Sequence, residues 1–224
     1  MQALIAGATG LVGRTLLDAL LAEARVERVT AVLRRPSGRT HAKLEALSID
    51  FDQLERDLSG RTATHAFCCL GTTIKKAGSQ PAFYRIDHDY VLAFGRAAKA
   101  AGASKLLVVT ALGADAKSSV FYNRVKGEVE AHLAELGLPE LHLLRPSLLL
   151  GERAERRTAE AAAMALAKPF GHLLVGPLAR YRPIEGADVA LAMLALALEA
   201  TARPGVSIHE SEAIPKLARS SRRS

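Results

Sequence analysis

The residues best suited to chemistry in this sequence are Tyr122 and Lys126, which form the pattern Tyr-x-x-x-Lys. Four residues are close to one helical turn, so in a helix the phenol and the ammonium group lie on the same face. An unperturbed tyrosine has a pKa of about 10, and a neighbouring cation favours the phenolate, which brings proton exchange closer to neutral pH. The pair therefore indicates proton-transfer chemistry, with an exposed Tyr and Lys at ordinary helical spacing as the alternative.

A helix over residues 121–136 would hold this pair. Its apolar residues recur at one helical face and would dock it on the protein: Val125, Val129, Leu133 and Leu136. The segment follows an apolar run at residues 106–110 that has the composition of a buried strand. An isolated Tyr-x-x-x-Lys match is weak, but a place after the fifth strand of a nucleotide-binding pattern favours a functional pair.

That pattern begins at residues 2–13, QALIAGATGLVG, where an apolar strand breaks into three glycines and a helix follows. The unpaired N–H groups of a helix start carry partial positive charge, and a phosphate fits there. Gly7 allows a tight turn, Gly10 lets the backbone approach a pyrophosphate, and Gly13 lets the helix pack on the strand. An ordinary glycine turn is the alternative. The predicted nucleotide-binding residues here are Gly7, Thr9, Gly10, Leu11, Val12 and Gly13.

The second strand, near residues 29–33, ends in Arg34 and Arg35, about 20 residues past the glycine turn. An NAD-selective site usually presents an acid to the ribose at that point. A guanidinium instead holds a 2′-phosphate bidentately, so the sequence predicts NADP(H) as the cofactor. Two solvated arginines at a strand end are the alternative.

Two further segments are predicted to bind the cofactor. Asp50 follows the third strand and would accept from the adenine amine, or would equally start the next helix, as would Asp52. Leu70, Gly71 and Thr72 follow the fourth strand, and ligands bind at the carboxyl edge of an open parallel sheet. An ordinary strand-to-helix turn is the alternative for this loop.

Strand and helix patterns alternate along the chain, which predicts an α/β protein: a three-layer Rossmann fold with a doubly wound, mainly parallel sheet. We expect one domain over residues 1–217, in which residues from about 147 to 186 cover the substrate, and a basic disordered tail over residues 218–224. After Pro146 the alternation is expected to stop. Strands are expected near residues 3–6, 29–33, 47–49, 65–69, 106–110 and 141–144, and helices near 11–22, 53–58, 83–101 and 121–136.

Composition favours a soluble, cytoplasmic protein, with 49% hydrophobic and 24% charged residues. The longest apolar run, residues 189–198, is shorter than the roughly 20 residues of a membrane helix, and no signal peptide is expected. Cys68 and Cys69 are adjacent in a predicted strand, so they point to opposite faces and are expected to be buried apolar residues. We expect no metal site and no membrane partner.

The net charge of +7 raises the possibility of nucleic acid. Part of that charge lies in the last nine residues, and the sequence has no zinc-finger spacing, aromatic RNA-binding motif or helix-turn-helix signature. The basic balance fits anionic small ligands at least as well. The expected partner is a small-molecule substrate, with no nucleic acid, and the expected state is a monomer or homodimer.

The glycine turn and the Tyr–Lys pair together resemble the short-chain dehydrogenase/reductases. Within that superfamily the chain is most similar to the atypical group related to the Tat-interactive protein, and the resemblance runs from about residue 2 to about residue 215. Three strings carry it: FCCLGTT at residues 67–73, DHDYVL at residues 87–92 and VKGEVEA at residues 125–131.

The resemblance implies a Rossmann fold that binds NADP(H), with Tyr122 as proton donor or acceptor. It implies that Lys126 holds the nicotinamide ribose and tunes Tyr122. The superfamily also places a hydroxyl after the fifth strand to hold the reacting oxygen. Here the expected serine pair is replaced by Thr110 and Ala111, so either Thr110 serves or Ser118 or Ser119 does.

The resemblance also implies that Arg145, Pro146 and Ser147, after the sixth strand, pass the nicotinamide. The predicted function is an NADPH-dependent oxidoreductase that acts on a carbonyl or an alcohol, with Tyr122 protonating the oxygen. Dehydratase or epimerase chemistry on the same fold is an alternative. A second alternative is a non-catalytic NADP(H) sensor that regulates a partner, which the altered hydroxyl position favours.

Overall fold

The computed structural model describes residues 1–151 and 180–221, and its centre is a seven-stranded sheet in which every pairing is parallel. β7 (Leu149–Leu150) and β8 (Ile184–Glu185) form a separate parallel pair. The order across the main sheet is β3 (Leu44–Ser48), β2 (Arg28–Leu33), β1 (Gln2–Ala6), β4 (His65–Cys68), β5 (Lys105–Val109), β6 (Glu140–Arg145) and β9 (Gly205–Glu210).

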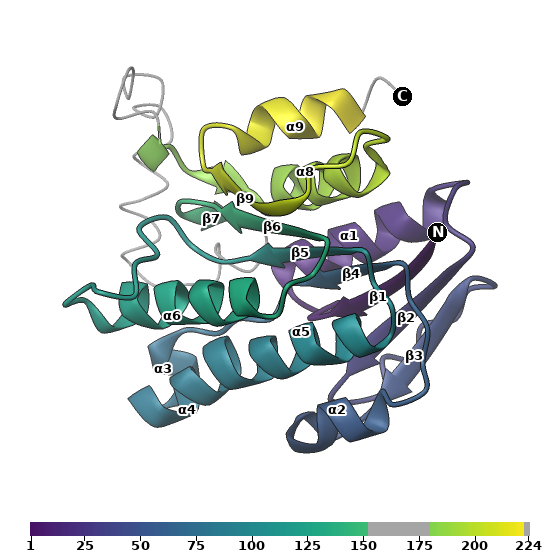
Figure 1. Cartoon of the computed structure of the whole chain (residues 1–224), viewed down its shortest axis with the longest axis horizontal. Coiled ribbons are helices and arrows are strands. Elements are labelled where there is room, and N and C mark those ends of the chain that lie inside the picture. The colour runs from purple at the N-terminus through teal and green to yellow at the C-terminus, as the bar shows by residue number, and fades with distance from the viewer. Residues whose placement is uncertain (152–179, 222–224) are drawn as a thin grey trace.

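Helices cover both faces of the sheet, as Figure 1 shows. Leu16, Leu20 and Met193 belong to the apolar core on one face, while Leu54, Phe94 and Leu133 belong to the core on the other. The first face is covered by α1 (Leu11–Ala22), α8 (Gly186–Leu198) and α9 (Ile214–Ser221), and the second by α2 (Leu54–Asp57), α5 (Tyr90–Ala100) and α6 (Phe121–Glu135). The predicted three-layer α/β fold is therefore confirmed.

Shorter helical segments connect these layers. A 3₁₀ turn, η1 (Phe51–Gln53), precedes α2, and α3 (Ile74–Ala77) and α4 (Gln80–Tyr84) follow β4. The predicted helix over residues 83–101 is interrupted by a π-helical segment, η2 (Arg85–Asp89). Such π turns inside helices are rare and often occur at functional sites.

The expectation that the alternation stops after Pro146 is wrong, because α8 and β9 continue it. β9 pairs with β6 and completes the sheet. The helix was missed because α8 is apolar nearly all round and lacks the polar face that marks an amphipathic helix. Val206 and Ile208 are half exposed at the sheet's edge, so β9 also lacks a clear alternation.

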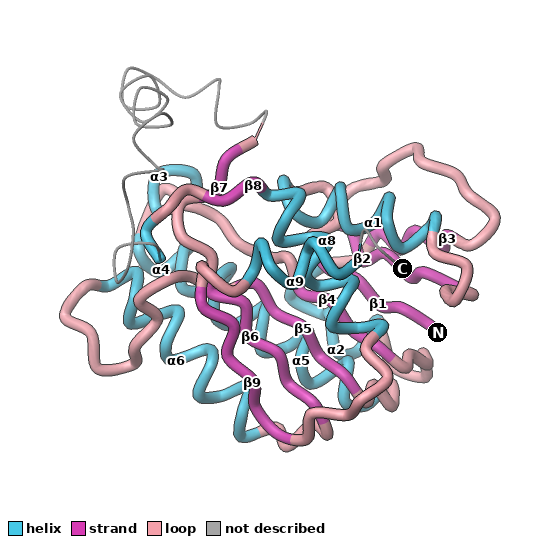
Figure 2. The backbone as a smooth tube through the Cα atoms, turned by 90° about the horizontal axis from the view of Figure 1, so that it is seen from above, coloured by secondary structure: helices cyan, strands magenta, loops and turns pink. Residues whose placement is uncertain are grey.

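The predicted tail is also partly wrong. Residues 218–221 form the end of α9, and Ala218 is buried in the core, which fixes this segment to the protein. Residues 222–224, and residues 152–179 of the segment expected to cover the substrate, lie outside the described residues. β8 leads directly into the start of α8, as Figure 2 shows.

The order of the sheet reverses between β1 and β4, so the loops after these two strands leave in different directions. In open α/β sheets a crevice forms at such a switch point, and ligands bind there. The two loops lie in contact: a Cβ on Gly7 would be 2.4 Å from the Cys69 carbonyl oxygen. The fold therefore brings the glycine turn and the loop after β4 to one place.

Candidate nucleotide-binding and active site

The glycine turn has the geometry that its sequence predicts. Gly7 has φ +81°, in the left-handed region that favours glycine, and its carbonyl oxygen accepts from the Gly10 N–H at 2.9 Å. A Cβ on Gly13 would lie 2.1 Å from the Gly7 oxygen, so only glycine lets α1 pack this closely. α1 begins at Leu11 with no side-chain cap, which leaves backbone N–H groups at its N-terminus for a ligand.

A cavity of about 650 Å³ lies against this turn at the carboxyl end of the sheet. It collects side chains from the ends of β1, β4, β5 and β6 and from α6. Most of the predicted site residues line it: Gly10, Leu11, Val12, Leu70, Gly71, Thr72, Thr110, Tyr122, Lys126, Pro146 and Ser147. The sheet thus brings together residues predicted from four separate motifs.

Tyr122 and Lys126 both line this cavity from α6. The Tyr122 ring packs against Phe83 of α4 with 5.6 Å between ring centroids, which fixes the ring while its hydroxyl has no partner among the described residues. Gly127 lets α6 approach the loop after β5, because a Cβ there would lie 2.0 Å from the Ala116 nitrogen. Tyr122 and Lys126 are therefore held on a helix whose backbone packs directly against the backbone of the loop after β5.

Asp87 is a site residue that the sequence interpretation did not single out. Its Oδ1 lies 2.7 Å from Lys126 Nζ, and its Oδ2 accepts from the Thr72 backbone N–H at 2.9 Å. Both charged side chains are almost fully buried, at 1% and 4% exposure. The sequence marked Asp87 only as the first residue of the string DHDYVL and gave it no role, because Asp87 and Lys126 meet only in the folded protein.

The ion pair changes the protonation of Lys126. Burial by itself lowers the pKa of this ammonium, but the Asp87 carboxylate and the Tyr122 phenol together raise it above its usual value. Lys126 therefore stays charged near neutral pH. Burial raises the pKa of the neighbouring Cys68 thiol to about 12, so this cysteine is an inert core residue.

Thr110 lines the cavity, but its hydroxyl is used inside the protein. Its Oγ1 lies 2.6 Å from Glu130 Oε1 and 3.2 Å from the Leu144 carbonyl oxygen. Both neighbours are acceptors, and a hydroxyl has one hydrogen to donate. In this arrangement that hydrogen is not offered to a substrate oxygen, which departs from the role expected for Thr110.

Neither of the alternative serines takes that role in the structure. Ser118 and Ser119 do not line the cavity, and Ser118 Oγ accepts from the Val120 N–H. Ser147 lines the cavity, but its hydroxyl donates to the Arg182 carbonyl oxygen. Thr72 lines the cavity too, and its hydroxyl has no partner among the described residues.

Arg145 is predicted to lie in the segment that passes the nicotinamide, but its guanidinium is held by two glutamates. Arg145 Nε lies 3.1 Å from Glu130 Oε1, and its NH1 lies 3.0 Å from Glu210 Oε1. It does not line the cavity. The arginine instead ties α6 and β6 to β9, behind the wall that carries Thr110.

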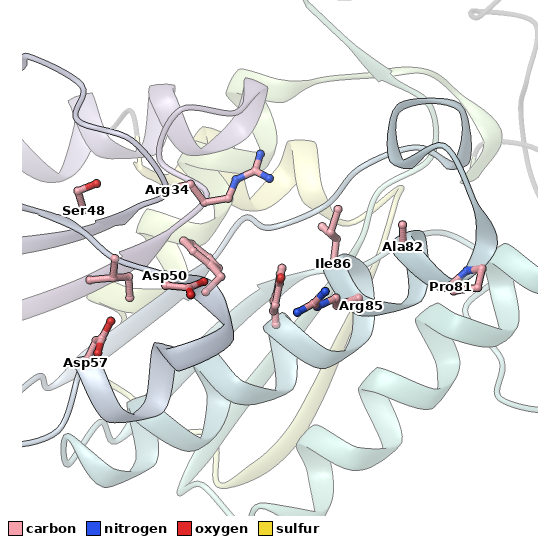
Figure 3. A pocket seen from close by; sticks show the side chains of 11 residues that line it. Arg34, Ser48, Asp50, Asp57, Pro81, Ala82, Arg85 and Ile86 are labelled. Atoms are coloured by element: carbon pink, nitrogen blue, oxygen red, sulfur yellow. The ribbon is translucent and has the colours of Figure 1, made fainter.

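A second cavity, of about 890 Å³, lies beside the ends of β2 and β3 (Figure 3). Arg34 and Asp50 border it, with Arg85 of η2 on another side. Arg34 and Arg35 are exposed, and neither makes an ion pair with a described residue. An exposed, unpaired guanidinium at the end of β2 is available for an anionic ligand.

Asp50 has the capping role that the sequence left open. Its side chain accepts from the Asp52 N–H and caps η1, which favours the helix-start interpretation, while its carboxylate still borders the cavity. Asp52 accepts from the Tyr90 hydroxyl at 2.7 Å and pairs with Arg85. These contacts join η1, η2 and the start of α5, which all border this second cavity.

This fold and site define a nucleotide-binding Rossmann protein with a short-chain dehydrogenase/reductase type of Tyr–Lys pair. The chain belongs to the family described as NAD(P)H-binding, which matches residues 7–199. It is 38% identical to HTATIP2 of Rattus norvegicus over 75% of this chain and 70% of that protein. It is 37% identical to the mitochondrial protein fmp52 of Emericella nidulans over 74% of each chain. The resemblance to the atypical group is thereby confirmed.

Solved structures share the fold at low sequence identity. The oxidoreductase ylbE of Lactococcus lactis aligns with a TM-score of 0.66 at 17% identity, covering 98% of this chain and 96% of that one. UDP-glucose 4-epimerase of Thermotoga maritima, solved with UDP-glucose, aligns with a TM-score of 0.65 at 17% identity over 98% and 82%. Such likeness supports the Rossmann fold.

The expected cytoplasmic location is contradicted by the curated relatives. The fmp52 proteins of Emericella nidulans, Aspergillus niger and Scheffersomyces stipitis are named mitochondrial. The expectation was based on the composition and on the short length of the longest apolar run. These two features do not distinguish one cellular compartment from another. Among the described residues, no helix has the length and apolar character needed to span a membrane.

Proposed function

We propose that this protein is an NADP(H)-dependent oxidoreductase that acts on a carbonyl or an alcohol. One observation carries the proposal: Tyr122 and Lys126 line the same cavity as the start of α1. A proton donor and a phosphate-binding helix end then face one space. A cofactor and a small substrate would meet there.

The residues around the cavities fit the parts of a dinucleotide. The N–H groups at the start of α1 would hold the pyrophosphate, and Gly71 and Thr72 would line a ribose. When bound, the cofactor supplies a hydride to the carbonyl carbon. Tyr122 donates its proton to the carbonyl oxygen, and the Lys126 ammonium stabilises the phenolate that is left.

The preference for NADP(H) rests on the end of β2. Arg34 and Arg35 are exposed there, and no acid stands at the position where an NAD site presents one. A guanidinium without an ion-pair partner can bind a 2′-phosphate without first breaking another contact. Arg34 borders the second cavity, which would receive the adenosine end.

A second candidate is a non-catalytic NADP(H)-binding protein that regulates a partner. The Thr110 hydroxyl favours it, because its hydrogen is directed at Glu130 or Leu144 rather than at the cavity. Such a protein would keep cofactor binding and lack turnover. The Tyr122–Lys126 pair favours the enzyme.

The decisive experiment begins with the cofactor. Nucleotide released by denaturing the purified protein is identified by absorbance and mass, and NADPH and NADH are titrated calorimetrically. NADPH consumption is then followed with a broad panel of aldehydes and ketones. Tight NADPH binding with turnover supports the enzyme, tight binding without turnover on any carbonyl supports the sensor, and the absence of nucleotide binding overturns both.

A further inference from the structure

Asp87 connects two parts of the site that come from distant places in the chain. One carboxylate oxygen lies 2.7 Å from Lys126 Nζ on α6, and the other accepts from the Thr72 N–H in the loop after β4. Gly71 lies beside this corner, since a Cβ there would be in ordinary van der Waals contact, 3.5 Å from Asp87 Oδ1 and 4.0 Å from Lys126 Nζ. Asp87 of η2 therefore links the loop after β4 to α6.

The two contacts require a carboxylate. Both partners, an ammonium and a backbone N–H, are donors, and an ionised Asp offers acceptors on both oxygens. An Asn of the same shape has one acceptor oxygen, so its NH₂ group would face one of the two donors. Because Asp87 is 1% exposed, water does not repair such a mismatch.

The groups that face the Lys126 ammonium come from three elements. Among the described residues Asp87 of η2 carries the only carboxylate that faces it, Tyr122 comes from α6 itself, and Cys68 lies at the end of β4. A buried ammonium without a counterion loses its proton readily. The charge of Lys126 thus depends on Asp87 more than on any other described residue.

We propose that Asp87 is a positioning residue of this site, which keeps Lys126 charged and joins it to the Gly71–Thr72 loop so that both present one rigid surface to the cofactor's ribose. This inference rests on the proposed function for its ligand. The geometry of the ion pair does not depend on that ligand. The two can therefore be tested apart.

The first test needs no cofactor. The side-chain Cε signal of Lys126 is followed by NMR as a function of pH in protein labelled with ¹³C-lysine, and Lys126→Arg assigns it. The variants are Asp87→Asn, Asp87→Glu and, as a matched control, Asp89→Asn. Asp89 lies in the same π-helical segment, contacts His88 and is half exposed.

In Asp87→Asn the pKa of Lys126 is expected to fall by about 1 to 3 pH units, the scale of one close opposite charge. Asp87→Glu is expected to restore most of that loss, and Asp89→Asn to leave the titration of Lys126 unchanged. A titration of Lys126 that does not move in folded Asp87→Asn overturns the inference. The ¹⁵N spectrum of Asp87→Asn shows whether that variant folds. If it does not fold, Asp87→Glu decides the question, because a Lys126 titration like that of the unmodified protein supports the role of the carboxylate charge.

The second test measures NADPH affinity by fluorescence across the pH range. In Asp87→Asn the affinity is expected to fall about tenfold or more, and the fall is expected to deepen as the pH rises and Lys126 loses its proton. A loss that is equal at every pH indicates a merely structural Asp87. If the unmodified protein does not bind NADPH, the proposed function fails, while the titration of Lys126 still decides this inference.

Discussion

Thr110 Oγ1 lies 2.6 Å from Glu130 Oε1 in the interior between β5 and α6. Glu130 in turn receives the Arg145 guanidinium, so the hydroxyl is the end of a buried polar chain. Polar groups buried in this way stabilise a fold when every partner is satisfied. The Thr110 hydroxyl therefore stabilises the fold in this structure. This role can be tested separately from the alternative role, in which the hydroxyl holds the reacting oxygen.

Thr110→Val tests those roles. We expect the free energy of unfolding to fall by about 1.5 to 3 kcal/mol, the scale of a hydrogen bond to a charged group, while turnover per folded molecule changes little. Thr110→Ser keeps the hydroxyl and is expected to retain most of the stability. Denaturant unfolding and steady-state kinetics measure the two effects. Lost turnover with unchanged stability would instead assign the catalytic hydroxyl to Thr110.

Tyr122→Phe separates an enzyme from a sensor. The ring still packs on Phe83, so α6 is expected to dock as before and NADPH affinity to stay nearly constant. Turnover is expected to fall by about 10² or more, the scale of a positioned acid. The control is Tyr84→Phe, because Tyr84 does not line the cavity that Tyr122 and Lys126 border. Full activity in Tyr122→Phe rules out the phenol as the proton donor.

Lys126→Ala is expected to behave differently from Tyr122→Phe. It removes the group proposed to touch the ribose and leaves the Asp87 carboxylate buried without its counterion. NADPH affinity, turnover and stability should therefore fall together. Calorimetric titration beside kinetics distinguishes this pattern, and a variant that loses turnover at unchanged affinity would argue against ribose contact.

Arg34→Ala tests the cofactor preference. We expect the unmodified protein to bind NADPH more tightly than NADH, and the variant to lose one to two powers of ten of that difference, or about 1.5 to 3 kcal/mol. NADH affinity should change little. Arg25→Ala is the matched control, because Arg25 precedes β2 at the opposite end and pairs with Glu23. Equal affinities for both cofactors in the unmodified protein would refute the argument.

Acid is expected to destabilise the protein through the buried pair His142 and His209, whose facing nitrogens are 3.0 Å apart. Burial, and then the neighbouring His142, lower the pKa of His209 from 6.5 to about 4, and burial also lowers the pKa of His142. In that window the unfolded chain binds more protons than the folded one, so stability is lost as the pH falls from 6.5 toward 4.

Urea unfolding at about pH 7 and about pH 5 measures this loss, which for His209 is about 2 kcal/mol over that interval. His209→Gln should flatten the dependence, and the control His41→Gln, at an exposed histidine, should not. A stability that is level between these two pH values would show that the pair does not stay neutral.

The sequence predicted the features that depend on short stretches of neighbouring residues. The glycine turn, the first six strands and the Tyr122–Lys126 spacing each lie within a dozen or so residues, and the structure places them as expected, except that β3 starts earlier, at Leu44. The roles of Asp87, Glu130 and Arg145 depend on contacts between elements that are far apart in the chain. Asp87 and Glu130 lie in the strings DHDYVL and VKGEVEA, but no local pattern gives either of them a role, because a buried acid looks like any other acid until its partner is known.

Arg145 joins Glu130 of α6 to Glu210 of β9, so the helix that carries Tyr122 is tied to the last strand of the sheet. On a ribosome, β9 leaves the exit tunnel after the other strands of the described sheet. Parallel pairing between distant segments is slow to form, and the edge of β6 stays open until β9 arrives. The helix that carries Tyr122 therefore gains this anchor only after β9 is made, and a chain cut short before Gly205 would display an unpaired, aggregation-prone strand.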